Sequence, residues 1–383
     1  MTVYIHDAVR TPRGKARPDG GLAHRTPPEL VVHLIDALEA RGRAPRSARL
    51  LVLGCVGQIG AQGGHIAMVA KLTAGLAAAT AAHSINNFCA SGLSAIGQAA
   101  AAIAAGTVDH ALAGGVEMPS RVPFMGDAAD YYTATDMVPA LRYIPVALAA
   151  DLLTVREGID RPALDAVALT SQERATAAEN RPALTASRIA LDGLDRDETV
   201  RAITADSLAA MTPAFAALAD SYRWAIGDRA IEHRHTIGHA PPMADGAGLA
   251  LLGPADAARP PRARIVAFAE AGGNARDSLL AGFAAMDLAL ARSRLKLADL
   301  DRIEFMEAFA VTIARFLRDV PVDPDRVNVG GGHIAKGHPM GATGAILLST
   351  LLDALDEIKG RYGLVVATGA QGVGVAMIVE RLA

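Results

Sequence analysis

The chain has 383 residues, of which 51% are hydrophobic and 20% are charged, so it can bury a large core and does not have a disordered composition. Its 37 basic and 40 acidic side chains give a formal net charge of −3, which offers no general positive surface to nucleic acid or anionic lipid. No run of about 18 apolar residues predicts a membrane helix, and the first residues lack the basic and apolar regions of a signal peptide. We therefore expect a cytoplasmic protein with no nucleic-acid or membrane partner.

The first third of the chain predicts strands that alternate with helices. Apolar runs at residues 3–9 and 50–53 predict two strands, and a third strand ends at residues 114–117. A turn of small residues around Cys89 precedes the third strand. After this turn, four apolar residues recur at helical spacing: Leu93, Ile96, Ala100 and Ile103. Cys89 is therefore predicted just before the start of a helix.

The last third repeats this order, which indicates an internal duplication. Predicted strands at 265–269 and 303–305 precede a glycine-rich turn through His338, then a helix after Gly341 and a strand at 363–367. This alternation predicts an α/β protein with parallel sheets covered by helices on both faces.

The segment between the two halves interrupts this rhythm with repeated prolines and a helical pattern at 162–179. We interpret it as a cap inserted over the site. The predicted domains are an N-terminal half (1–118, completed by about 245–262), a cap (119–244) and a C-terminal half (263–383).

Cys89 and His338 are the strongest chemical candidates. The free N–H groups at a helix start favour a thiolate and can hold an oxyanion, although an isolated cysteine is more often a buried structural thiol. Cys55 lacks this context, and we predict a structural role for it. Pro339 biases His338 toward an extended backbone, and His338 lies at the position in the second half that mirrors Cys89. This placement suits a base that activates the thiol.

Six motifs occur in the order and spacing of the thiolase family, the acetyl-CoA acyltransferases, and this resemblance covers essentially the whole chain. They lie at residues 3–12, 87–92, 114–117, 245–247, 307–310 and 337–339. The resemblance implies the duplicated five-layer αβαβα thiolase fold and a homodimer or homotetramer. It also implies a coenzyme A thioester substrate with no permanently bound cofactor. By the same resemblance, Cys89 takes an acyl group while His338 activates the thiol and contributes to an oxyanion hole.

Two positions depart from the family pattern. Thr368 stands where the family has its second cysteine, which moves the substrate's α-proton, and a hydroxyl is too weakly acidic to replace that base. Thr368 would still hold a water or an oxygen. Met306 stands where an Asn or His holds the water of one oxyanion hole, and losing one such donor typically costs about two to three orders of magnitude in rate. His333 is a candidate to compensate as base or donor; in the alternative, it points away and bonds to backbone.

The predicted coenzyme A residues are altered as well. Arg201 and Ser207 match family positions that face the nucleotide, and Arg201 would pair with a phosphate unless both residues are simply solvated. Pro241 replaces the serine beside the pantetheine, and Gly369 and Ala370 follow Thr368 in the altered turn.

Several other side chains near the motifs have more than one possible role. For His239 we favour a structural role, and we predict no metal site at the cluster His233, His235 and His239 because no carboxylate is suitably spaced. Glu117 and Glu307 are the carboxylates nearest the motif turns. Glu307 would orient an active-site group from a strand end, and either glutamate would equally cap backbone amides. Five cap residues would narrow an acyl tunnel or pack a subunit interface: Phe124, Met125, Tyr131, Tyr132 and Tyr143.

The leading function is an acyltransferase with an acyl-Cys89 intermediate. The second step is condensation or thiolysis of a 3-oxoacyl-CoA, or acyl transfer to another acceptor. One alternative is a weakly active or inactive partner subunit that binds acyl-CoA. A further alternative is a thioester hydrolase.

Overall fold

The computed structural model describes residues 1–229 and 231–382. In this range nine strands follow one hydrogen-bonded path, β4-β3-β5-β6-β1-β7-β10-β9-β8, and the tenth strand, β2, pairs with β6. The strands are β1 (Tyr4–Arg10), β2 (Gly14–Lys15), β3 (Leu50–Gly54), β4 (Ala81–Ile85), β5 (Ala111–Glu117), β6 (Ala244–Gly253), β7 (Ala263–Gly272), β8 (Arg302–Phe305), β9 (Tyr362–Thr368) and β10 (Val373–Arg381).

The α-helices of the described range are given in chain order, and α4 to α8 lie in residues 119–244, the segment predicted as the cap. They are α1 (Pro27–Ala40), α2 (Ile66–Thr73), α3 (Ser91–Ala104), α4 (Val146–Glu157), α5 (Arg161–Ala178), α6 (Ala205–Ala209), α7 (Ala216–Ser221), α8 (Arg223–Ile226), α9 (Ala281–Ser293), α10 (Ala310–Asp319), α11 (His333–Lys336) and α12 (Thr343–Ile358). None of these described helices is long and apolar enough to cross a membrane.

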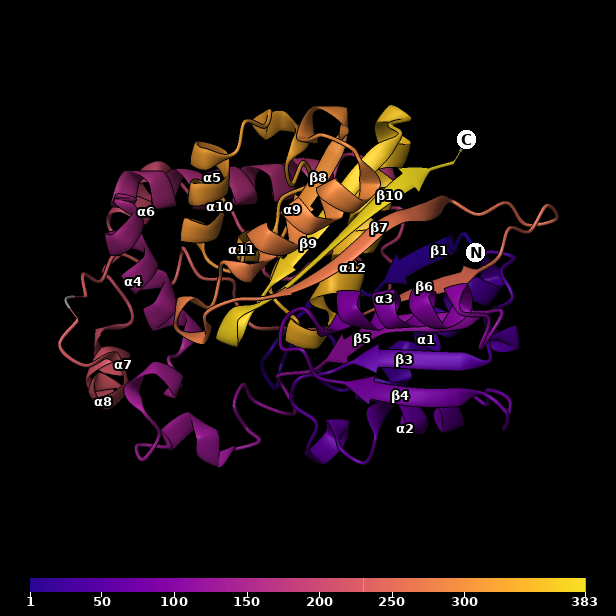
Figure 1. The fold of residues 1–383 in the computed structure, drawn as a ribbon, viewed down its shortest axis with the longest axis horizontal. Coiled ribbons are helices and arrows are strands. Elements are labelled where there is room, and N and C mark those ends of the chain that lie inside the picture. Colours follow the sequence, from indigo (N-terminus) through magenta and orange to yellow (C-terminus); the bar gives the residue numbers. More distant parts are fainter. Residues whose placement is uncertain (230, 383) are drawn as a thin grey trace.

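The helices and strands form five layers. Helices α1 and α2 cover the outer face of β4-β3-β5-β6-β1, and α9 covers the outer face of β7-β10-β9-β8. Helices α3 and α12 lie between the two groups of strands and contact both. Figure 1 shows the N-terminal strands and the C-terminal strands side by side, with the cap helices at the left. The predicted α/β class and duplicated αβαβα arrangement are confirmed.

The prediction of parallel sheets was wrong for most of the ladders. Among the ladders between the described strands, parallel pairing is confined to β3 with β4, β3 with β5, and β8 with β9. Strands β1, β6, β7 and β10 pair antiparallel with their neighbours. The reason is the connection: β10 follows β9 through a short turn, which forces an antiparallel pair, and β6 arrives from the cap rather than from a crossover helix.

Two glycines let the central helices meet at their N-terminal ends. A Cβ at Gly92 of α3 would lie 2.8 Å from the carbonyl oxygen of Gly341, and one at Gly344 of α12 would lie 2.5 Å from the backbone nitrogen of Leu93. Larger side chains would push the helices apart because backbone atoms cannot move aside. This contact holds the turn before α3 against the turn before α12.

The cap has a small core of its own, separate from the core between the sheets. It is built mainly by α4, α7 and α8, through Ile144, Leu148, Ala149, Ala219, Ala225 and Ile226. Helix α5 packs against α10 and α11 of the C-terminal half. The cap is thereby anchored to the C-terminal half next to the α11 turn.

Candidate active site

Cys89 lies in a tight turn between β4 and α3, and the prediction that it precedes a helix is confirmed. Phe88 has a φ of 46°, an unusual conformation for a side chain of this size. Its amide donates to Oδ1 of Asn86 at 3.0 Å, and its carbonyl accepts from the Ser91 hydroxyl at 2.6 Å. The same hydroxyl accepts from the Asn87 amide at 2.8 Å. These bonds fix the direction of Cys89.

His338 comes from the opposite turn, between α11 and α12. Its amide donates to the Pro242 carbonyl at 2.8 Å, which holds the extended backbone that Pro339 favours. Its Nε2 lies 3.2 Å from Sγ of Cys89, and its Nδ1 lies 2.8 Å from Oγ1 of Thr343. The two predicted residues are therefore in contact, and Thr343 orients the imidazole.

Sequence reasoning did not assign a role to Thr343. The signal was present, because this threonine begins the helix that follows the His338 turn. Its side chain is fully buried.

The environment keeps both reacting groups neutral at rest. Burial, with a contribution from the Glu117 carboxylate, raises the pKa of Cys89 to about 12. Burial, with a contribution from the Arg13 guanidinium, lowers the pKa of His338 to about 3. The backbone N–H groups of Ala370 and Cys89 face the sulfur and oppose the rise in the thiol pKa. The neutral imidazole therefore keeps a ring nitrogen beside the thiol, and two backbone donors face the sulfur.

The buried Glu117 side chain links the turns around the site. Its carboxylate accepts hydrogen bonds from the amides of Val56 at 2.8 Å, Gly57 at 3.0 Å and Gly341 at 3.0 Å, and from Nε2 of Gln62 at 2.7 Å. Glu117 thus caps backbone amides, the role considered for it from the sequence.

Cys55 and Glu307 have structural surroundings. Sγ of Cys55 lies 3.6 Å from Glu117, and burial, aided by this carboxylate, raises the pKa of the thiol. Glu307 accepts from the Ser171 hydroxyl at 2.7 Å and the Ile334 amide at 3.0 Å, so it too holds backbone and side chains in place.

Cys89 and His338 open onto a cavity of about 370 Å³ with walls that are mostly apolar. Five further residues from the sequence analysis line it: Pro241, Met306, Thr368, Gly369 and Ala370. The hydroxyl of Thr368 donates to the Val373 carbonyl at 3.3 Å. The cap contributes Phe124, Met125, Phe215, Leu218 and Tyr222. The last three of these cap residues were not singled out from the sequence.

The other cap aromatics gather beside this wall. The ring of Tyr143 lies 4.9 Å from that of Tyr132 and 5.9 Å from that of Tyr131, centroid to centroid. These tyrosines pack against one another within the cap.

Arg201 and Ser207 lie outside the walls of this cavity. Arg201 is exposed, and its backbone amide donates to Gln172 at 3.1 Å. Ser207 is also exposed, and with Thr204 it caps the start of α6. No side-chain contact in the described residues joins either one to Cys89 or His338.

His333 lies behind His338 rather than on the cavity wall. Its ring is fully buried and stands edge-on to the His338 ring, with 5.6 Å between the centroids. Neither ring nitrogen has a hydrogen-bond partner among the residues described. Burial and the nearby Arg13 hold its pKa well below the ordinary value, so the ring stays neutral.

The three cap histidines each bond to an aspartate. His233 and His235 lie 2.9 Å and 2.8 Å from the Asp151 carboxylate, and His239 lies 2.7 Å from Asp165. Because these aspartates belong to α4 and α5, the bonds anchor the segment that enters β6.

Two groups of strands around a pair of central helices, with a thiol and an imidazole meeting where those helices begin, define a class of α/β proteins with a paired cysteine–histidine site. The Thiolase, N-terminal domain model matches residues 3–220, and the Thiolase, C-terminal domain model matches residues 259–381. The chain belongs to the thiolase family.

Named relatives agree with this assignment. The chain is 32% identical over 402 residues to a 3-ketoacyl-CoA thiolase of Erwinia tasmaniensis and 33% identical over 397 residues to one of Shewanella denitrificans. Each alignment covers 99% of both proteins. Among solved structures, human mitochondrial 3-ketoacyl-CoA thiolase superposes with a TM-score of 0.88 at 26% identity, covering 100% of this chain and 99% of the human one.

Proposed function

We propose that this protein is a thiolase-type acyltransferase in which Cys89 takes the acyl group of an acyl-CoA and His338 takes the proton of the thiol. The observation that carries the proposal is the 3.2 Å contact between Sγ of Cys89 and Nε2 of His338 on the wall of an apolar cavity. The names of the relatives, 3-ketoacyl-CoA thiolases, support a coenzyme A thioester as the substrate.

The acylation step follows from the geometry. As the proton moves from Sγ to Nε2 of His338, the sulfur forms a bond to the thioester carbonyl carbon. The carbonyl oxygen becomes negative and accepts hydrogen bonds from the N–H groups of Cys89 and Ala370. The tetrahedral intermediate then expels coenzyme A as its thiolate, which takes the proton from His338. The products are acyl-Cys89, free coenzyme A and a neutral imidazole.

The second step lacks two groups of the family pattern. Condensation or thiolysis passes through loss or gain of an α-proton, and Thr368 supplies only a weakly acidic hydroxyl that bonds to the Val373 carbonyl. Met306 adds a thioether, which cannot donate a hydrogen bond to an enolate oxygen. We therefore propose acyl-Cys89 formation as the core activity, followed by carbon–carbon chemistry at reduced efficiency or by transfer to another acceptor.

Intact-protein mass spectrometry after mixing with acetyl-CoA, and separately with a medium-chain acyl-CoA, tests the proposal. We expect one acyl adduct on the wild type and on Cys55→Ser, which serves as the matched control. We expect no adduct on Cys89→Ser. An adduct that persists in Cys89→Ser, or that is absent from the wild type with every thioester, contradicts the proposal.

The same experiment separates the alternatives. An adduct that decays to free acid without an added acceptor indicates a thioester hydrolase. Binding of acyl-CoA without any adduct indicates a partner subunit. A homodimer or homotetramer remains a prediction, which light scattering of the purified protein would test.

A further inference from the structure

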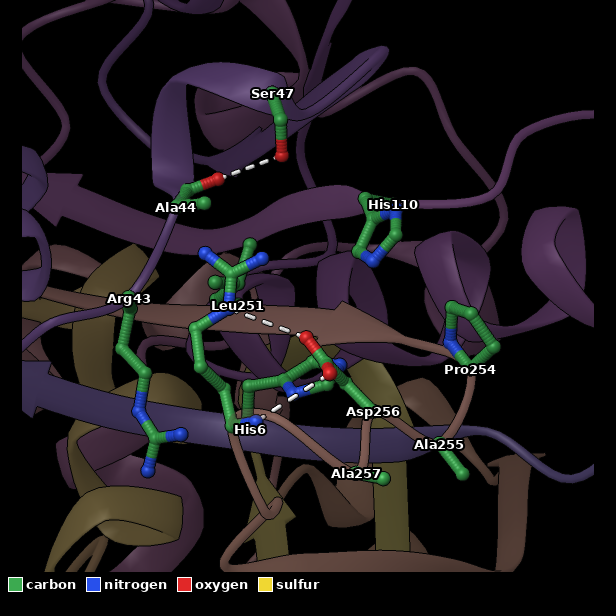
Figure 2. Close-up of a pocket in the computed structure, with 11 residues that line it drawn as sticks. His6, Arg43, Ala44, Ser47, His110, Leu251, Pro254, Ala255, Asp256 and Ala257 are labelled. Carbon is green, nitrogen blue, oxygen red and sulfur yellow. Dashed lines mark hydrogen bonds and ion pairs between the residues drawn. The ribbon is translucent and has the colours of Figure 1, made fainter.

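A second cavity, of about 270 Å³, lies far from Cys89. Strand β5 ends at Glu117 beneath the active site, and β6 begins next to the His338 turn. The second cavity lies at the other ends of these strands, beside His110 before β5 and Pro254 after β6. Figure 2 shows its labelled side chains, which include His6, Arg43 and His110.

An imidazole in this cavity has an unused nitrogen. His6 is only 4% exposed, and its Nε2 has no hydrogen-bond partner among the described residues. The ring of His110 lies 5.9 Å from the ring of His6, centroid to centroid. Burial, His110 and Arg43, in that order, lower the pKa of His6. A buried polar nitrogen without a partner costs free energy, so its presence on a cavity wall indicates a group that would bond to it.

The basic side chains on the cavity wall, two arginines and two histidines, outnumber its one carboxylate. Arg43 donates to the Pro260 carbonyl at 3.0 Å, and its Nε lies 3.9 Å from the Asp7 carboxylate. Asp7 is also shared with Arg41 at 2.9 Å and with Arg262 at 3.1 Å. One carboxylate thus serves three guanidinium groups, although Arg262 has further acidic partners.

The one carboxylate on the cavity wall is already engaged. Asp256 accepts from the amides of Ala258 at 2.9 Å and Arg259 at 3.3 Å, and from Nε of Arg259 at 3.1 Å. These bonds lower the pKa of Asp256. Asp256 thus pairs with Arg259, whereas the charge of Arg43 acts on His6.

We propose that this cavity binds a small oxyanion with two negative charges, either inorganic phosphate or the phosphoryl group of a phosphate monoester, through Arg43, His6 and His110. Guanidinium and imidazole N–H groups are the donors that such oxygens prefer. The volume lies just below the roughly 300–1,000 Å³ of sites for drug-sized ligands, which favours a small ion or group. The site is separate from the acyl-transfer chemistry and does not depend on it.

Binding would be coupled to protonation. In the free protein His110 and Arg43 disfavour the charged form of His6, and a bound dianion would reverse this effect. The backbone carbonyls of Pro254 and Arg259 also favour the charged form of His6. The two nearby carboxylates have other partners, because Asp256 bonds to Arg259 and Asp7 lies beside Arg43. The protein should therefore take up a proton with the anion, and binding should strengthen as the pH falls.

Isothermal titration of the full-length protein with sodium sulfate tests this coupling, because sulfate keeps its two charges across the range. We expect saturable binding that is about fivefold or more tighter near pH 6 than near pH 8. Parallel titrations with inorganic phosphate and glycerol phosphate near pH 7.5 distinguish the free ion from the ester as the better ligand.

Two variants locate the binding. Arg43→Gln and His110→Gln should each weaken binding about tenfold or more, whereas Arg17→Gln, the loss of an exposed arginine elsewhere, should leave it unchanged. If Arg43→Gln fails to fold because it also loses the bond to Pro260, His110→Gln decides alone. The proposal is overturned if no anion binds saturably, if affinity is the same at both pH values, or if His110→Gln binds as the wild type does.

Discussion

Replacing Thr343 with valine should slow acylation of Cys89, because it removes the group that sets the tautomer of His338. For Nε2 to accept the thiol proton, the ring hydrogen must sit on Nδ1, where it donates to Oγ1 of Thr343 at 2.8 Å. Valine has nearly the same shape but offers no acceptor. The ring must then keep a buried N–H without a partner, or move the hydrogen to Nε2 and lose its basic nitrogen.

The size of the effect follows from the cost of an unpaired buried donor. That cost is about 1–3 kcal/mol, and each 1.4 kcal/mol is a factor of about ten in rate. We therefore expect acylation to fall by about 5- to 150-fold in Thr343→Val. Binding of acyl-CoA should change little, since Thr343 is buried behind His338 and does not line the cavity.

The assay is a single-turnover measurement in which the acyl-enzyme is quenched at short times and quantified by intact mass. Thr343→Ser keeps a hydroxyl and should recover most of the rate. Thr350→Val is a matched control, because Thr350 is a buried threonine of the same helix whose hydroxyl only bonds backbone carbonyls. A Thr343→Val rate within about twofold of the wild type would refute the assigned role of the hydrogen bond.

Three other predictions concern the same site. Because the pKa of His338 is lowered to about 3, the neutral imidazole is present throughout pH 5–9. The acylation rate, measured by single turnover across this range, should therefore not fall as the pH drops through 6.5. A fall near pH 6.5 would contradict the neutral state of His338. The rate at which iodoacetamide alkylates Cys89 should rise about tenfold per pH unit between 7 and 9, because a thiol pKa raised to about 12 leaves only a small fraction as thiolate. Mass spectrometry of the Cys55→Ser variant measures this rate without alkylation of the other cysteine. A rate that levels off within this pH range would contradict the prediction. Glu117→Gln should lower the free energy of unfolding, measured by urea titration, by about 2–4 kcal/mol. The reason is that a side-chain amide cannot accept hydrogen bonds from all the donors that surround this carboxylate. A loss below about 1 kcal/mol would show that these donors find other partners.

The sequence was sufficient to predict what depends on local pattern. Helical spacing after Cys89, and the apolar run after Gly341, place α3 and α12 where the structure has them. The fold class could be predicted because the motif order is preserved along the whole chain. Strand direction could not, since parallel and antiparallel strands have similar apolar runs and differ through their connections.

The pairing of Cys89 with His338 at the candidate site was predictable from the sequence, and the surroundings of the two residues were not. Cys89 and His338 stand in distinctive turns, whereas the partner of each depends on how the turns meet in space. Thr343 contacts His338 because α12 begins there, and Glu117 reaches Gly341 because β5 ends beneath that turn. Arg201 shows the converse: a charge that matches a family position in sequence lies exposed and away from the cavity.

The two departures from the family motifs have a common physical effect. Met306 follows β8 and Thr368 ends β9, so both belong to the part of the cavity wall that the C-terminal half supplies. Attack on a thioester develops charge on the carbonyl oxygen beside the Cys89 amide, where donors are in place. Removing an α-proton develops charge on an enolate oxygen of the second substrate, where Met306 offers no donor and Thr368 no effective base. Since each missing interaction raises only the barrier of the second step, we expect acyl-Cys89 to accumulate rather than turn over rapidly to a 3-oxoacyl product.

Thr368→Cys tests this expectation. The variant should restore a proton carrier and raise exchange of the acyl-CoA α-hydrogen with deuterated water by about tenfold or more, while leaving the acylation rate within about twofold of the wild type. Unchanged exchange would mean that the enolate donor, and not the base, limits the step, and Met306→Asn in the same background would then be needed to recover it.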